Sequence, residues 1–275
     1  MSGAINSWME AKPAAADYID VSQGDIANNY AAIAVMVGAL MQNLVLTQSS
    51  ASPAVLTITA DRLALFNTDT VPLCYVARSA NLTATITASG ANGLDTGSEA
   101  ASTWYFAWAI YNPTNDVLAS LLSTSATAPT MPSGYTFKRL VGAVRNDGSS
   151  NFIAFVQRGN RVTYKAVQSM VSSGAATSYT QIAMAALLPS IAKRVIGQAY
   201  PKNTTNNEYT RVHLADDSSG NYAIMLAGIC RTTNSYTGLY FELELVADID
   251  VYYKIETLVG TGSATLEIIG YYVEI

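Results

Sequence analysis

Residues 82–88, LTATITA, and residues 104–111, WYFAWAIY, decide the fold class. In the first stretch apolar residues alternate with threonines, which would place one face of a strand on a core and a ladder of hydroxyls on the other. The second stretch is the most aromatic segment of the chain, and in it Trp104, Phe106, Trp108 and Ile110 alternate with Tyr105, Ala107, Ala109 and Tyr111. A side-chain period of two is typical of β-strands and differs from the 3.6-residue period of a helix.

The same period continues on both sides of these stretches. Residues 137–165 read as an antiparallel three-stranded meander, with turn signals at 146–149 and 159–160. Residues 172–178 are small and predict a linker or a long loop, and residues 182–188 predict a short helix. Further strands are expected at residues 55–60, 71–78, 211–215, 222–230, 240–246, 251–258 and 265–275.

Short strands separated by turn signals, without recurring helices to cover a parallel sheet, indicate a mainly-β chain. We expect an antiparallel, jelly-roll-like β-sandwich with a short amino-terminal helix. Residues 51–170 are expected to form one sandwich, and residues 171–275 either a second sandwich or the second half of the same one. Residues 1–50 are expected to form a helical segment for oligomerisation or for docking on a larger particle.

A helix is predicted over residues 25–44, after a capping-box-like pair formed by Ser22 and Asp25. Its apolar residues follow alternating steps of four and three, and isoleucine at one of the two core positions favours three chains over two in a coiled coil. A single amphipathic helix lying on a sheet is the alternative. The residues of the predicted oligomerisation helix are Ile26, Tyr30, Ile33, Val37, Leu40 and Leu44.

The composition excludes several classes of partner. Charged residues are 13% of the chain, against about 25% in typical globular proteins. The net charge is −5 with 15 Lys and Arg residues, which argues against nucleic acid as a partner. The longest apolar run, residues 31–41, is too short to cross a bilayer, and residues 1–20 do not resemble a secretory signal. We therefore expect no membrane insertion, and synthesis and folding in a cytoplasm.

No motif in the chain predicts catalysis, a metal or a cofactor. Residues 95–98, DTGS, match the active-site turn of aspartic peptidases, but no second such turn supplies the partner carboxylate. His213 is the sole histidine and lies in a predicted strand. A glycosidase would need two carboxyl groups about 5 to 10 Å apart, and no spacing singles out such a pair. Residues 216–221 gather oxygen ligands but lack the spacing of a calcium loop, so a hairpin turn is the simpler interpretation.

Three tyrosines are candidate glycan contacts, because aromatic rings stack on the apolar faces of sugars. Tyr200, Tyr209 and Tyr236 fall in stretches that look like loops and are rich in Asn and Thr. The alternative is that each tyrosine is a packed lid or an interface residue.

The stretch from residue 93 to residue 165 resembles segments of phage tail-fibre and related virion proteins. The resemblance covers about a quarter of the chain and implies a β-sandwich in a homotrimeric virion appendage, whose amino-terminal part docks on the particle. It implies no catalytic residue at these positions. It is carried by residues 93–100 (GLDTGSEA), 103–105 (TWY), 110–113 (IYNP), 121–130 (LLSTSATAPT), 132–135 (PSGY) and 145–149 (RNDGS).

Together these features predict a structural, non-enzymatic protein of a tailed-phage virion, made in the host cytoplasm. The expected role is a trimeric tail-fibre or spike component, whose partners are copies of itself, other virion proteins and host surface polysaccharide. A head decoration or connector protein with no receptor role is the alternative within the same particle. An aspartic-type peptidase or a glycosidase is the remaining, less favoured alternative.

Overall fold

A computed structural model describes residues 41–48, 51–67, 74–232, 235, 237–246 and 249–275. The described part is almost entirely β-structure, and every ladder between its strands is antiparallel. The sequence-based fold class, a mainly-β antiparallel sandwich, is confirmed. The amino-terminal helix that the sequence predicts lies, apart from its last residues, outside the described part of the chain.

The strands form two sheets. The elements are β1 (Met41–Gln42), β2 (Val45–Gln48), β3 (Val55–Asn67), β4 (Cys74–Thr85), β5 (Trp104–Asn112), β6 (Val117–Ser123), β7 (Phe137–Arg145), β8 (Phe155–Arg158), β9 (Arg161–Gly174), β10 (Thr180–Ile182), the 3-10 turn η1 (Met184–Ala186), β11 (Ala192–Asn203), β12 (Glu208–Ala215), β13 (Ile224–Cys230), β14 (Leu239–Glu244), β15 (Val251–Thr257) and β16 (Gly262–Val273). The twelve-stranded sheet has the order β14-β11-β16-β9-β8-β2-β3-β7-β5-β6, with β1 and β4 also paired to β3. The four-stranded sheet has the order β10-β15-β12-β13.

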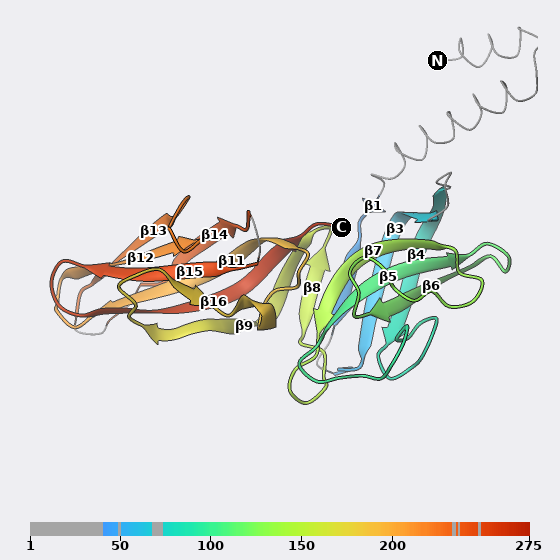
Figure 1. Cartoon of the computed structure of the whole chain (residues 1–275), viewed down its shortest axis with the longest axis horizontal. Coiled ribbons are helices and arrows are strands. Elements are labelled where there is room, and N and C mark those ends of the chain that lie inside the picture. Colours follow the sequence, from blue (N-terminus) through green and yellow to red (C-terminus); the bar gives the residue numbers. More distant parts are fainter. Residues whose placement is uncertain (1–40, 49–50, 68–73, 233–234, 236, 247–248) are drawn as a thin grey trace, which may run out of the picture.

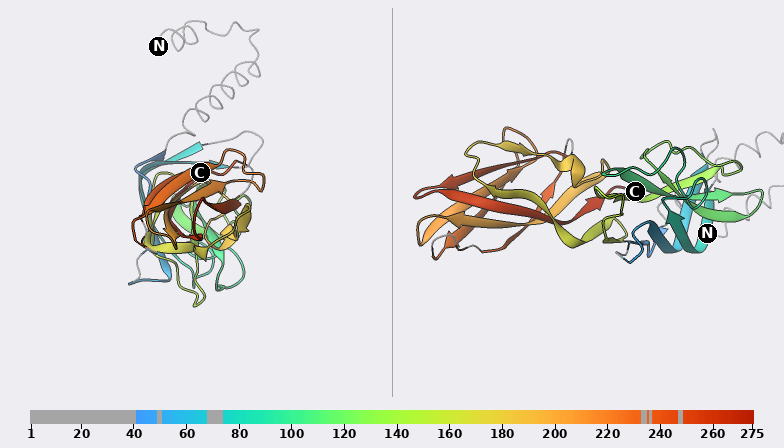
Figure 2. Two further views of the ribbon diagram at one scale, coloured as in Figure 1. Left: turned by 90° about the vertical axis from the view of Figure 1, so that its left-hand side faces the viewer. Right: turned by 90° about the horizontal axis from the view of Figure 1, so that it is seen from below.

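The molecule is elongated and has two lobes (Figure 1). The first lobe contains β1 to β8, and the second contains β9 to β16, with the four-stranded sheet packed on the larger one (Figures 1 and 2). The larger sheet continues from one lobe into the other, because β9 pairs with β8 at its start and with β16 along its length. One hydrogen-bonded sheet therefore connects both lobes.

Residues 41–48 belong to this sheet and not to the predicted helix. Leu44, placed on the helix seam by the heptad pattern, is 1% exposed and lies in the core between β1 and β2. Burial alternates with a period of two at Leu44, Leu46 and Gln48, which is why this segment pairs as a strand between β3 and β8. Leu44 offers no surface to a neighbouring chain. The other five residues of the predicted oligomerisation helix, Ile26, Tyr30, Ile33, Val37 and Leu40, lie outside the described residues.

Several further elements differ from the expectations. Strands β6 and β11 are present where no strand is predicted, and β9 extends to Gly174, into the predicted linker. Residues 182–188 contain the end of β10 and the three-residue turn η1 in place of a longer helix. Nearly all of β6 is buried, which hides the alternation on which the strand predictions depend.

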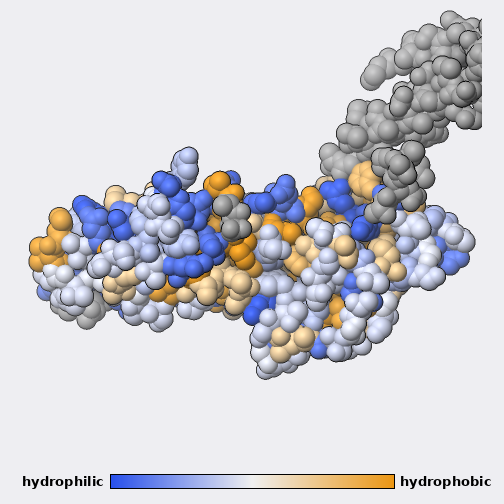
Figure 3. Space-filling view, viewed as in Figure 1, coloured by the Kyte–Doolittle hydropathy of each residue, from blue (hydrophilic) through white to orange (hydrophobic). Residues whose placement is uncertain are grey.

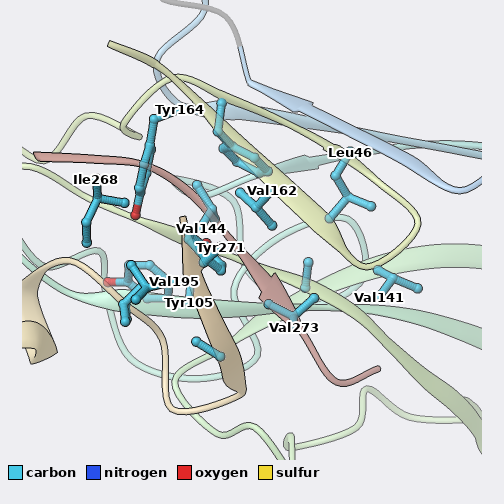
Figure 4. Packing of buried hydrophobic residues seen from close by; sticks show 14 of the residues in the cluster. Leu46, Tyr105, Val141, Val144, Val162, Tyr164, Val195, Ile268, Tyr271 and Val273 are labelled. Atoms are coloured by element: carbon cyan, nitrogen blue, oxygen red, sulfur yellow. The ribbon is translucent and has the colours of Figure 1, made fainter. Parts of the chain in front are cut away.

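The two lobes share a core that includes their junction. Tyr271 is fully buried, and its ring lies 6.4 Å, edge-on, from that of Trp104 and 5.7 Å from that of Tyr164. Tyr164 donates a hydrogen bond to the carbonyl of Leu187 at 2.7 Å, and Trp104 Nε1 donates to the carbonyl of Ala185 at 2.9 Å. Figure 4 shows Tyr164 and Tyr271 among the aliphatic side chains of both lobes.

Candidate ligand-binding site

Two of the three tyrosines predicted to contact glycan lie in strands and not in loops. Tyr200 lies in β11, half-buried, and its hydroxyl donates to Gln198 Oε1 at 2.5 Å. Tyr209 lies in β12 and is 53% exposed. The two belong to different sheets, and no hydrogen bond or ring contact joins these two described side chains. Tyr236 lies outside the described residues.

The Asp95 carboxylate joins two loops. Its Oδ1 accepts a hydrogen bond from the backbone N–H of Thr96 at 2.7 Å, and its Oδ2 accepts one from the N–H of Thr130 at 2.9 Å. The Asp95 N–H donates to the carbonyl of Leu122, so that the loop also covers the edge of β6. These bonds give the DTGS turn a structural role in the first lobe.

His213 belongs to a surface ion network on the four-stranded sheet. Its Nε2 lies 3.1 Å from Glu256 Oε2, and Glu256 Oε1 accepts a hydrogen bond from Arg211 at 2.5 Å. The Arg211 bond is the main cause that lowers the pKa of Glu256, so this carboxyl is ionised at neutral pH. The network holds β12 and β15 side by side.

The acidic turn at residues 216–221 uses its carboxylate internally. Asp217 Oδ1 accepts bonds from the N–H groups of Ser219 and Asn221, and Oδ2 accepts one from Asn221 Nδ2 at 2.7 Å. The side-chain bond from Asn221 is the leading cause that lowers the pKa of Asp217. Within the described ranges, no group of three or more His, Cys, Asp and Glu side chains could hold a metal ion.

The strongest candidate site is a row of side chains that crosses the boundary between the lobes. Arg158 of β8 is the cross-strand partner of Arg161 of β9, Arg161 is the partner of Tyr272 of β16, and Tyr272 is the partner of Arg194 of β11. Directly opposite residues point to the same face of a sheet, so these four side chains stand together. We call Arg158, Arg161, Tyr272 and Arg194 the arginine row.

Burial shows that the arginine row lies on the outer face of the sheet. Arg158 and Arg161 are exposed, and Arg194 and Tyr272 are half-buried. The residues next to them along the strands point inward and are buried: Gln157, Val162, Val195 and Tyr271. The row therefore presents its charges to solvent, while the opposite face of the same strands forms the core.

A hollow of about 770 Å³ adjoins the row. It lies where the carboxyl end of β16 approaches β1 and the hairpin between β8 and β9. Its polar lining groups come from the second lobe and from Asn160 of the hairpin, while β1 contributes Met41. Hydrophilic residues are frequent on the surface of the second lobe (Figure 3). The hollow is lined by Met41, Asn160, Lys193, Arg194, Glu244, Tyr272, Val273, Glu274 and Ile275.

Arg194 organises the end of the row that lies on the second lobe. It forms ion pairs with Glu244 and with Glu242, at 3.1 Å for the latter, and its guanidinium lies 5.2 Å from the centre of the Tyr272 ring. Glu242 also accepts a hydrogen bond from the Tyr240 hydroxyl at 2.5 Å. A guanidinium group can bind the polar groups of a ligand, and a tyrosine ring beside it can pack against a flat apolar face of the same ligand.

The pKa shifts keep these groups in one protonation state near neutral pH. The hydrogen bond from Tyr240 is the main cause of the lowered pKa of Glu242, and the bond from Arg194 adds to it, while burial opposes the shift. Desolvation, followed by the bond to Glu242, raises the pKa of Tyr240 to about 12. The hydrogen bond to Glu244 is the main cause of the raised pKa of Arg194. Glu242 is thus ionised, and Tyr240 remains a hydroxyl donor.

Sequence reasoning missed the arginine row because its members lie far apart along the chain. Arg158 and Arg161 flank the Gly159-Asn160 turn that the sequence does predict, so one half of the row could have been found from that hairpin. Tyr272 and Arg194 are more than thirty residues further on, and β11 is not predicted. Only the sheet order brings them together.

Comparison with known proteins adds no relative. No protein-family model matches the chain, and no curated protein matches its sequence. Within the described ranges, no helix has the length and apolar character needed to cross a membrane. The functional interpretation therefore depends on the residues and the geometry described above.

Proposed function

We propose that the chain is a structural component of a tailed-phage appendage, such as a trimeric tail fibre or spike, that displays a binding face for host surface polysaccharide. The observation that supports this most is the continuous twelve-stranded sheet, which joins two lobes into one elongated body. An elongated β-body with few charged residues suits a protein that is built into a larger assembly.

The resemblance to tail-fibre proteins supports the same proposal. The stretch from residue 93 to residue 165 contains β5 to β8, the start of β9 and the loops between them, which is a large part of the first lobe. In that lobe the DTGS turn joins loops, as a connecting role would require. Most of the second lobe lies outside the resemblance, as do Arg194 and Tyr272 of the arginine row, and these parts would supply what differs between appendages.

Light scattering tests the trimer directly. The full-length chain is compared with a chain that starts at residue 41, because β1 and β2 must be kept. A trimer of about three times 29.2 kDa that is lost on truncation assigns assembly to residues 1–40. A trimer that survives truncation places the contacts in the β-body. A full-length monomer at micromolar concentration contradicts the appendage proposal.

Binding to bacterial cells separates a receptor-binding appendage from a decoration or connector protein. The arginine row is the feature that favours the former, because a connector has no need of an exposed row of paired arginines beside a hollow. Fluorescently labelled full-length protein is expected to bind cells of a susceptible strain and to be released by their purified surface polysaccharide. Assembly into particles without any cell binding would favour the connector.

A further inference from the structure

The hairpin between β8 and β9 places two positive charges side by side. Arg158 and Arg161 are direct cross-strand partners, and both are exposed on the same face. Like charges at opposite positions destabilise a sheet. No carboxylate of the described residues lies within ion-pair distance of either arginine, and Glu242 and Glu244 pair with Arg194. A tyrosine hydrogen bond is the main cause of the lowered pKa of Glu242 and the charge of Arg161 adds to it, so the nearest negative charge is one that Arg194 already binds.

A paired arginine is not sufficient to make a site. Arg62 of β3 and Arg78 of β4 are also direct partners and exposed, on the first lobe. There, however, the neighbour of Arg62 on the other side is Gln42, which carries no charge. The arginine row differs because it continues across two more strands through Tyr272 and Arg194.

We propose that the arginine row binds a polysaccharide that carries carboxylate or phosphate groups. Neighbouring strands are about 4.8 Å apart, so the three steps from β8 to β11 span about 14 Å, long enough to meet several sugar units. Each guanidinium can bind a carboxylate or a phosphate with two parallel hydrogen bonds. This inference rests on the proposed appendage function in one respect: that function identifies the host surface as the source of the polysaccharide.

The groups around the row suit the uncharged part of such a ligand. Asn160 lines the hollow beside Arg161 and can exchange hydrogen bonds with sugar hydroxyls. Tyr240 is 51% exposed, which leaves ring surface for the apolar face of a sugar. A ligand with alternating anionic and hydroxyl groups therefore finds a partner for each kind of group along one face.

Nucleic acid fits this surface less well. A polyphosphate needs a longer basic stripe, and the chain as a whole has a net charge of −5. Glu242 and Glu244 close one end of the row with negative charge and would repel a phosphate chain that continued in that direction. Single-stranded DNA is accordingly a control ligand in the experiment.

The test is a titration of the full-length protein with four defined polymers by isothermal calorimetry. Polygalacturonate supplies carboxylates, a teichoic acid supplies phosphates, dextran is neutral, and single-stranded DNA is the nucleic acid. Each is titrated into the wild type, into R158A/R161A and into the matched control R62A/R78A. All four substituted arginines are exposed. Each double variant removes two positive charges that stand opposite each other on neighbouring strands, so the unfolding temperature should stay unchanged or rise slightly.

We expect binding of at least one acidic polysaccharide, a loss of tenfold or more in R158A/R161A, and less than a twofold change in R62A/R78A. Binding of only one of the two acidic polymers identifies the anionic group. The proposal is overturned by no binding of either, by equal losses in both double variants, or by equally tight binding of DNA. The solution mass is measured independently, so row-dependent binding by a monomer would reject the appendage and keep the binding site.

Discussion

In the first lobe the amide side chains of Asn146 and Gln157 are fully buried and donate to backbone carbonyls. In the second lobe the ionic side chains lie on outer faces, and every ion pair between described residues joins two residues within 193–274. Both lobes are antiparallel β-structure and share one sheet. The second lobe also buries polar side chains that donate to backbone carbonyls, namely Asn203 and Thr210, so the lobes differ in where the described ion pairs lie.

The position of the ion pairs bears on the roles that we propose for the two lobes, a scaffold in the first and a binding surface in the second. A buried amide that bonds to a carbonyl fixes a loop, and removing it leaves that carbonyl without a partner. Exposed ion pairs contribute only about 0.2 to 1 kcal/mol each to stability. The ion pairs of the second lobe therefore contribute little to the free energy of folding. We propose that the pairs around Arg194 hold charged groups in place for a ligand.

The largest effect is expected from a truncation that removes β2. A chain that starts at residue 51 lacks the strand that joins β3 to β8, whereas a chain that starts at residue 41 retains it. Without β2, the strands β3 and β8 lose a pairing partner and the core around Leu46 is exposed to solvent. The loss in the free energy of unfolding should exceed the roughly 5 to 15 kcal/mol that stabilises a typical domain. Circular dichroism should show cooperative unfolding for the longer chain only. If the shorter chain unfolds at the same temperature, the lobes do not depend on a continuous sheet.

The next effect concerns the junction. Replacing Tyr271 by Ala removes a fully buried ring between Trp104 and Tyr164 and should lower the free energy of unfolding by about 3 to 5 kcal/mol. Tyr222→Ala is the control, because Tyr222 is 87% exposed, and it should change stability by less than about 0.5 kcal/mol. Urea denaturation followed by tryptophan fluorescence measures both. Two separate transitions in Tyr271→Ala would mean that the lobes can unfold independently.

A smaller effect is expected from a buried amide of the first lobe. Asn146 Nδ2 donates to Glu99 Oε1 at 3.0 Å and to the carbonyl of Ala100 at 3.1 Å. Asn146→Ala should cost about 1 to 3 kcal/mol in the same denaturation experiment, because both acceptors lose their donor. Asn115, which is exposed and donates through its backbone N–H, gives the matched control Asn115→Ala. Equal losses in the two variants would mean that the buried amide of Asn146 contributes no more to stability than the exposed side chain of Asn115.

The sequence predicted the fold class because alternation is visible wherever one face of a strand is polar. It failed where both faces are covered, as in β6, and where the apolar residues of the predicted helix ran into the sheet, as at Leu44. Leu44 fits both the heptad pattern of the predicted helix and the two-residue period of the strand that follows. Spacing alone therefore does not distinguish the end of the helix from the start of the strand.

The candidate site was less predictable than the fold. Tyr200 and Tyr209 were chosen for their polar neighbours, but the structure places them in strands on different sheets. The arginine row depends on the pairing of β8, β9, β16 and β11, which combines residues from distant parts of the chain. Long-range register is fixed by packing of the whole sheet, and local pattern carries little information about it.

The smallest expected effect is the acid dependence of the ion pairs beside the row. The pKa of Glu242 is lowered in the folded protein, chiefly by the Tyr240 hydrogen bond. Its contribution to stability is therefore present above the unfolded-state pKa of about 4.3 and is lost as the pH falls through the folded-state value. Glu242→Gln should lower the unfolding temperature slightly at pH 7, by an amount that corresponds to less than about 1 kcal/mol.

The difference between wild type and Glu242→Gln should shrink as the pH falls through the folded-state pKa of Glu242, because the wild-type carboxyl then also loses its charge. Glu208→Gln is the matched control, since Glu208 has no ion-pair partner among the described residues and should follow the wild-type curve. Thermal scans from pH 7 to pH 2 measure all three proteins. A gap between wild type and Glu242→Gln that does not narrow as the pH falls would mean that the Tyr240 and Arg194 contacts stabilise the fold through packing and not through charge.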